Sequence, residues 1–257
     1  MATTILDHSL IAERYFFPDR QRLTGDGTRR IELPGATLAC YHHAPLAGAL
    51  TVVHFHGNAE IVADHVGPIM EAFEAIGLNV FFAEYRGYGD STGTPALGTM
   101  LDDVPALLDA TGIPTARMLL FGRSVGSLFA LRAASCRPQA AGLVLESAIA
   151  DPLERILMRV TPEELGRSRA ELAEVAKCLL DHERILRGFE RPVLVLHTRH
   201  DGLVDVDNAR RLHDWAAGPS RLRIFESGDH STILRANHEA YFEELERFVR
   251  DLCEPGD

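Results

Sequence analysis

Several features that would narrow the class of this protein are scarce in its 257 residues. The four cysteines lie far apart and form no Cys-x-x-Cys pair, a pattern typical of reduced thiols in a reducing compartment. No apolar run approaches the roughly 18 residues that a membrane span requires. Residues 1–20 lack the basic stretch followed by an apolar one that marks a secretory signal. We therefore expect a cytoplasmic protein without a membrane span.

Basic residues are also in deficit. The 26 Lys and Arg residues face 37 Asp and Glu residues, which gives a formal net charge of −11 at pH 7. A nucleic-acid-binding domain needs a basic surface, so we expect no nucleic-acid partner. The remaining composition, 46% hydrophobic and 25% charged, is ordinary for a soluble globular protein. A chain of this length is compatible with one large α/β domain.

Six short apolar runs are the main structural signal. Their nearly continuous apolarity is typical of strands buried on both faces of a sheet. The runs occupy residues 50–55, 79–85, 117–122, 142–147, 192–197 and 222–227. Helical patterns separate them, near residues 60–76, 99–111, 124–135, 207–217 and 238–253. This alternation predicts an α/β fold with a mostly parallel, doubly wound sheet and flanking helices. Two earlier segments around Gly35 predict an antiparallel hairpin at the edge of the sheet.

One segment interrupts this alternation. Residues 151–187 carry helical patterning with no strand among them, and Thr161-Pro162 predicts a helix start. The segment lies between two predicted parallel strands, so we expect it above the strand ends as a small helical lid. No linker or repeat divides the chain. We predict a single domain over residues 1–257 with a lid insert at about 151–187.

Gly122-Arg123-Ser124-Val125-Gly126 matches the motif G-x-S-x-G. An apolar run precedes it and a helical pattern follows, which is the strand–turn–helix setting of a nucleophile elbow. In such a turn the glycines relieve crowding and the strained serine exposes its hydroxyl. We predict that Ser124 is a nucleophile. The alternative interpretation is an ordinary strand-to-helix connection.

A nucleophilic serine requires a histidine base and an acid that orients the histidine. In this architecture the acid comes next in the chain, just past a strand end. Asp201 meets this condition, in a turn after residues 192–197. Asp205 and Asp207 are competitors, which we interpret as helix-start residues placed for the helix dipole.

The predicted base is His230, in the loop after the last predicted strand. His238 is the other candidate there, and we interpret it as a surface residue near a helix start. An oxyanion intermediate also needs two backbone N–H donors. We assign these to Val125, directly after the serine, and to Asn58, with Ala59 as the second choice for the latter.

Metal or cofactor chemistry is not indicated. His54 and His56 alternate on a strand, but the metal-binding pattern HxHxDH would need aspartate where Asn58 stands. No other cluster supplies three or four ligands at zinc spacing. The glycines of residues 82–93 lack the spacing of a dinucleotide loop. We expect no metal and no cofactor.

Six stretches together resemble the α/β-hydrolase superfamily, in particular its ABHD-type serine hydrolases. They are FHGNAE, EYRGYGDSTGTP, FGRSVGS, LESAIA, RPVLVLHTRHDGLV and SGDHS, and they span residues 50–232 in the order of that family. The resemblance implies the α/β-hydrolase fold with an eight-stranded core. It also implies a Ser124–His230–Asp201 triad, with oxyanion donors at Asn58 and Val125.

The chain departs from the family pattern at three positions. Thr198 stands where many relatives have glycine, and Glu84 stands where aspartate is common. Pro105 falls inside a predicted helix, so we expect the helix to start or kink there. None of these changes removes a predicted catalytic group.

The function that we predict is hydrolysis of a carboxylic ester of a small-molecule acyl substrate, through an acyl-enzyme. The weakly apolar lid favours small esters over long acyl chains. The alternatives are an acyl-thioesterase, a lipase, a peptidase, an acyltransferase or a carbon–carbon lyase on the same triad, or a non-catalytic binding protein of this fold. Beside the serine, Arg123 and Glu146 either form an ion pair or are paired separately.

Overall fold

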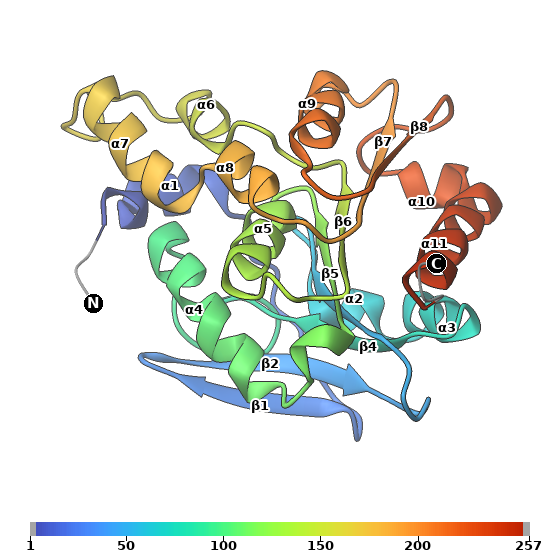
Figure 1. Ribbon diagram of the computed structural model, residues 1–257. Coiled ribbons are helices and arrows are strands. Elements are labelled where there is room, and N and C mark those ends of the chain that lie inside the picture. The colour runs from blue at the N-terminus through green and yellow to red at the C-terminus, as the bar shows by residue number, and fades with distance from the viewer. Residues whose placement is uncertain (1–3, 254–257) are drawn as a thin grey trace.

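Eight strands form one sheet in the computed structural model, which describes residues 4–253 (Figure 1). They are β1 (Thr28–Leu33), β2 (Ala36–His43), β3 (Thr51–Phe55), β4 (Asn79–Ala83), β5 (Met118–Arg123), β6 (Gly142–Glu146), β7 (Val193–Thr198) and β8 (Ser220–Phe225). Their spatial order is β1-β2-β4-β3-β5-β6-β7-β8. The hairpin β1–β2 is antiparallel and β2 runs antiparallel to β4, whereas β3 to β8 pair in parallel. The predicted mostly parallel α/β sheet is confirmed.

Helices cover both faces of this sheet because its central strands are apolar on both sides. Along β5, Met118 and Leu120 face one core, and Leu119 and Phe121 face the other. The first core is covered by α4 (Leu97–Ala110), α5 (Gly126–Cys136), α8 (His182–Arg187) and α9 (Asp207–Trp215). The second is covered by α2 (Val62–His65), α3 (Pro68–Ala75), α10 (Ile233–Ala236) and α11 (His238–Cys253) (Figure 1).

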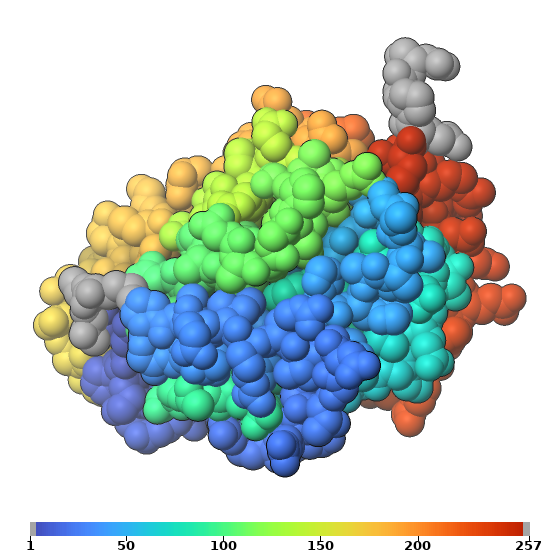
Figure 2. Space-filling view, turned by 90° about the horizontal axis from the view of Figure 1, so that it is seen from below, coloured from blue at the N-terminus to red at the C-terminus, as the bar shows by residue number. Residues whose placement is uncertain are grey.

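Five further elements complete the described chain: η1 (Ile5–Asp7), α1 (Ser9–Tyr15), η2 (Thr115–Arg117), α6 (Pro152–Leu157) and α7 (Arg169–Leu179). Figure 1 shows α6 and α7 beside α1 at one end of the molecule. Seen from below, the β1–β2 hairpin makes up a large part of the surface (Figure 2). No helix within residues 4–253 is long and apolar enough to cross a membrane.

Two helices begin later than predicted, because of backbone conformation. The helix predicted over 60–76 is two helices, and Gly67 between them has φ of 113°, a conformation that glycine adopts far more readily than other residues. Pro68 then starts α3. The helix predicted from 124 begins at Gly126, since Ser124 has φ of 52° and cannot continue a right-handed helix.

Pro105 does not start α4. The helix begins at Leu97 and continues past the proline. Proline removes the amide that would bond the Leu101 carbonyl, and Arg132 Nε donates to that carbonyl instead at 3.4 Å. A tertiary contact thus replaces the missing helical hydrogen bond.

The predicted helix start at Thr161-Pro162 is also wrong. Thr161 does cap the turn, with its Oγ1 accepting from the Glu164 amide at 3.3 Å. The chain makes only one turn there, because Gly166 adopts φ of 62°. The helix of this region, α7, begins after Ser168, whose hydroxyl accepts from the Glu171 amide at 3.3 Å.

Candidate active site

Ser124 lies at a sharp turn between β5 and α5. Its φ of 52° is in the left-handed region, which is strained for a residue with a side chain. The neighbouring glycines permit this turn by close packing. A Cβ on Gly126 would lie 2.0 Å from the Phe55 carbonyl oxygen, and one on Gly122 would lie 2.6 Å from the Ala130 Cβ. The G-x-S-x-G sequence therefore follows from the geometry of the turn.

Three of the predicted site residues lie within hydrogen-bonding distance in series. Ser124 Oγ is 2.8 Å from His230 Nε2, and His230 Nδ1 is 2.7 Å from Asp201 Oδ2. Ser124 follows β5, Asp201 follows β7 and His230 lies in the loop after β8, so the carboxyl ends of these strands bring the three residues together. Each is between 7 and 8% exposed, and Ser124 and His230 line the adjoining pocket.

Asp201 is held as a carboxylate by several donors. Its Oδ1 accepts from the backbone amides of Leu203 at 2.9 Å and Val204 at 2.8 Å. Burial opposes ionisation, but these bonds and the bond with His230 hold the pKa of Asp201 below its usual value. The carboxylate can therefore fix the imidazole ring and stabilise positive charge on it.

The competing residues lie elsewhere. Asp205 Oδ1 accepts from the Asp207 amide at 2.8 Å, and Asp207 is the first residue of α9. His238 begins α11, with its ring centroid 5.0 Å from that of Phe242. These positions agree with their interpretation as helix-start residues.

Asn58 and Val125, the predicted oxyanion donors, both line the pocket beside the serine. Within residues 4–253, neither the Asn58 amide nor the Val125 amide donates a hydrogen bond to a protein acceptor. The Ala59 amide, the second choice, is engaged by Asn58 Oδ1 at 3.1 Å. The same side-chain oxygen accepts from Tyr88 Oη at 2.8 Å and from the Phe17 amide at 2.9 Å, which fixes the loop.

Arg123 joins the serine turn to the histidine loop. Its Nε donates to Glu146 Oε1 at 2.9 Å, its Nη1 pairs with Glu60, and its Nη2 donates to the His230 carbonyl at 2.9 Å. Arg123 and Glu146 thus form an ion pair, which is one of the two interpretations that the sequence leaves open. The sequence does not predict that Glu60 takes part in this cluster. Although burial opposes ionisation, Arg123 lowers the pKa of Glu60, so the Glu60 carboxylate remains charged. Burial raises the pKa of the fully buried Glu146, and Arg123 acts in the opposite direction.

The histidines considered as metal ligands have other partners. His56 lies between the Gly57 carbonyl, 2.8 Å from Nδ1, and Glu84 Oε1, 2.7 Å from Nε2. His54 is buried among aromatic rings, 4.9 Å from Phe121 between centroids, and burial lowers its pKa. Within residues 4–253 no three His, Cys, Asp or Glu side chains are grouped as metal ligands.

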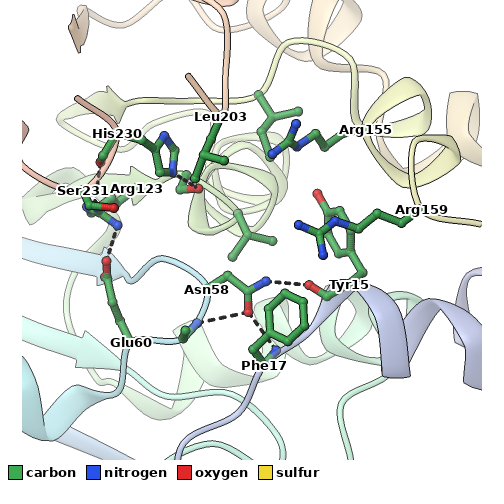
Figure 3. Close-up of a pocket in the computed structure, with 14 residues that line it drawn as sticks. Tyr15, Phe17, Asn58, Glu60, Arg123, Arg155, Arg159, Leu203, His230 and Ser231 are labelled. Atoms are coloured by element: carbon green, nitrogen blue, oxygen red, sulfur yellow. Dashed lines mark hydrogen bonds and ion pairs between the residues drawn. The ribbon is translucent and has the colours of Figure 1, made fainter. Parts of the chain in front are cut away.

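A cavity of about 360 Å³ opens onto Ser124 and His230 (Figure 3). Most of the residues that line this cavity are not predicted as site residues from the sequence. Tyr15 and Phe17 come from the segment before the sheet, and Arg155 and Arg159 come from the segment 151–187. The apolar spacing of residues 9–17 indicates an amphipathic segment, but no sequence signal specifies where it packs.

The sequence of this chain is similar to a known family model and to several curated proteins. The family model described as "Serine aminopeptidase, S33" matches residues 49–169. Protein YfhR of Escherichia coli O157:H7 is 25% identical over 80% of this chain and 72% of its own length. The alpha/beta hydrolase domain-containing protein aho-3 of Caenorhabditis elegans is 24% identical over 82% of this chain and 61% of its own length.

Among solved structures, mouse alpha/beta hydrolase domain-containing protein 10 superposes with a TM-score of 0.71 at 18% sequence identity. The match covers 88% of this chain and 99% of the mouse chain. These similarities confirm the predicted fold. The match covers 61 to 72% of the length of eight curated relatives, those named here among them.

Proposed function

Because the chain has the fold of the α/β-hydrolases and is similar to alpha/beta hydrolase domain-containing proteins, we propose that it is an ABHD-type serine hydrolase that cleaves a carboxylic ester. The observation that carries this proposal is the hydrogen-bonded series Ser124, His230 and Asp201 on a left-handed serine turn beside a cavity. A histidine within 2.8 Å of a serine hydroxyl is the arrangement that activates this nucleophile.

In the acylation step, His230 carries one proton from Ser124 to the alcohol, and the ester bond to the alcohol is replaced by an ester bond to Ser124. Ser124 Oγ attacks the ester carbonyl carbon while His230 Nε2 takes the hydroxyl proton. The carbonyl oxygen becomes an oxyanion, which the Asn58 and Val125 amides stabilise. As the tetrahedral intermediate collapses, the carbon–oxygen bond to the alcohol breaks and His230 gives the proton to the departing alcohol. Asp201 stabilises the imidazolium between these two transfers.

Deacylation repeats the sequence with water. His230 removes a proton from a water molecule as the water oxygen attacks the acyl carbon. The oxygen of Ser124 leaves with the proton held by His230, and the free acid departs. Every proton is returned, so this route consumes only ester and water. The strained turn of Ser124 keeps its oxygen at the mouth of the cavity throughout.

The insert 151–187 belongs to the same domain in this proposal and acts as a wall of the cavity. Its helix α8 packs against α5 and α9, and its residues Arg155 and Arg159 line the cavity. A volume of about 360 Å³ lies at the lower end of the range for small-molecule sites. We therefore propose small acyl groups as substrates.

The test is intact-mass spectrometry of the wild type and of Ser124→Ala after exposure to a fluorophosphonate. We expect one covalent adduct on the wild type and none on the variant. A series of 4-nitrophenyl esters with acyl chains of two to sixteen carbons then measures chain preference, and we expect the highest kcat/KM at the short chains. Absence of an adduct on folded wild type overturns the proposal, and the binding-protein alternative then takes its place.

A further inference from the structure

Two arginine side chains of the segment 151–187 enter the cavity. Arg155 lies on α6, and the helical turn continues past α6, because the Met158 amide donates to Glu154 O at 3.0 Å and the Arg159 amide to Ile156 O at 3.0 Å. Residues four apart on such a turn share one face. Figure 3 shows both guanidinium groups turned into the cavity, across it from His230.

Neither guanidinium has a carboxylate partner within residues 4–253. Arg155 makes one weak contact, from Nη1 to Met158 Sδ at 3.7 Å. Arg159 donates from Nη1 to the Arg14 carbonyl at 2.9 Å and lies 5.2 Å from the centroid of the Phe17 ring. Each guanidinium has five N–H donors, so most of them remain available to a ligand.

The nearby acids are engaged elsewhere. Glu154 pairs with Arg169, and Asp151 caps α6 by accepting from the Glu154 amide at 3.2 Å. Glu60, the acid that lines the cavity, pairs with Arg123. Asp151 and Asp205 line a neighbouring hollow that Arg155 also borders, but neither arginine forms an ion pair within residues 4–253, so both present a positive charge to this cavity in a chain whose net charge is −11.

Tyr15 adds a third donor on the same wall. Burial raises the pKa of its phenol to about 12, and the charges of Arg155 and Arg159, close enough to affect it, act in the opposite direction. The hydroxyl therefore stays protonated near neutral pH and can donate a hydrogen bond. Tyr15 lines the cavity together with both arginines (Figure 3).

We propose that Arg155, Arg159 and the Tyr15 hydroxyl form a subsite for a carboxylate on the acyl part of the substrate. The substrates are then monoesters of small dicarboxylic acids. This proposal rests on the proposed serine hydrolase function. His230 must protonate the departing alcohol, which places the alcohol beside His230 and directs the acyl chain across the cavity. A guanidinium fork matches the geometry of a carboxylate and can bind both of its oxygens.

The test compares two esters that differ in one charge, mono-4-nitrophenyl adipate and its methyl ester, after subtraction of the rate without enzyme. We expect the wild type to show a kcat/KM at least about tenfold higher on the carboxylate. Arg155→Gln and Arg159→Gln should each lower kcat/KM on the carboxylate about tenfold, the value of one charge-assisted hydrogen bond. In each variant the loss of kcat/KM should be several-fold smaller on the methyl ester than on the carboxylate, because only the carboxylate loses a charge-assisted hydrogen bond.

Three controls separate the charge effect from structural damage. Arg167→Gln removes an exposed arginine of the same segment that does not line the cavity, and it should leave both rates unchanged. Arg155→Lys keeps the charge and should retain part of the preference. Added NaCl should reduce the preference of the wild type by screening. Adipate itself should inhibit hydrolysis of the methyl ester competitively, and less so in the two Gln variants.

The outcomes distinguish this inference from the proposed function. If the wild type hydrolyses the methyl ester through Ser124 but shows no preference for the carboxylate, the subsite is wrong and the hydrolase stands. Equal loss on both esters in the Gln variants also overturns the subsite, since it indicates a structural role. If neither ester is hydrolysed and adipate does not bind, both proposals fail.

Discussion

At the scale of single residues, Arg123 links the serine turn to the histidine loop of the candidate site. It contacts two carboxylates and the carbonyl of His230, and it directly precedes Ser124. A buried ion-pair cluster contributes little net stability compared with an apolar replacement, but removing one partner leaves a buried charge uncompensated. We therefore regard Arg123 as a positioning residue that fixes the His230 loop relative to the serine.

Arg123→Lys tests this role. Lysine keeps the positive charge beside Glu60 and Glu146 but lacks the fork that also reaches the His230 carbonyl. We expect kcat on a neutral 4-nitrophenyl ester to fall about tenfold, roughly the cost of one hydrogen bond to a charged group, with KM unchanged within about twofold. The pH profile of kcat should also shift, because it reports the essential base in the complex. A variant with full kcat and an unaltered profile contradicts the positioning role.

The positions of Ser124, Asp201 and His230 could be predicted from the sequence because each follows a predicted strand, two of them strongly apolar and the last one, β8, with alternating polar residues. Parallel strands end at one edge of a sheet, so residues after them meet wherever the strand order allows. Arg155 and Tyr15 could not be predicted as cavity residues. Their placement depends on how two irregular segments pack, and local periodicity does not encode that.

At the scale of elements, α8 carries a buried histidine in the insert. His182 is 2% exposed, and its Nδ1 lies 2.8 Å from the Ile149 carbonyl, to which it donates. Within the described residues its Nε2 has no hydrogen-bond partner. Burial lowers its pKa from 6.5 to about 4. Protonation would bury a charge whose Nε2 proton has no acceptor. The neutral ring instead connects α8 to the segment after β6 through the Ile149 carbonyl.

This histidine should make the stability of the protein sensitive to acid. Between its folded and unfolded pKa values the unfolded chain binds the extra proton, so stability falls as the pH drops from about 6.5 to 4. We expect the wild type to lose about 2 kcal/mol more than His182→Asn between pH 7 and pH 5. Urea unfolding followed by fluorescence of Trp215, the single tryptophan, measures both values. Equal losses in the two proteins contradict this assignment.

Element boundaries were less predictable than the elements themselves. The turns at Gly67 and Gly166 end helical segments that the apolar pattern alone extends. Pro105 was expected to start or kink a helix, but Arg132 supplies a donor from α5. In each case a backbone conformation or a tertiary contact outweighs the local pattern.

At the scale of the whole molecule, the four cysteines are all free and differ in exposure. Cys178 and Cys253 are exposed and Cys136 is partly exposed, whereas Cys40 lies fully buried on β2 between β1 and β4. Burial raises the pKa of the Cys40 thiol to about 12. Because β2 joins the hairpin to the rest of the sheet, exposure of this thiol requires the sheet to open.

Cys40 should therefore report global unfolding. At pH 8 we expect an alkylating reagent to modify Cys178 and Cys253 rapidly and Cys40 at least about a thousandfold more slowly, as an unfolding free energy of several kcal/mol requires. Peptide mass spectrometry over time gives the rate at each site. Urea below the unfolding midpoint should accelerate Cys40 much more than Cys178. Similar acceleration of both thiols would show that the sheet opens locally at β2.

The route of the segment 151–187 has an evolutionary consequence. It leaves the sheet after β6 and rejoins it before β7, while Ser124, Asp201 and His230 all lie outside it. Under the proposed function, sequence change in this one segment alters the cavity wall through Arg155 and Arg159 and leaves the three proposed catalytic residues in place. Proteins that share this scaffold can therefore diverge in substrate specificity while they keep the same proposed triad.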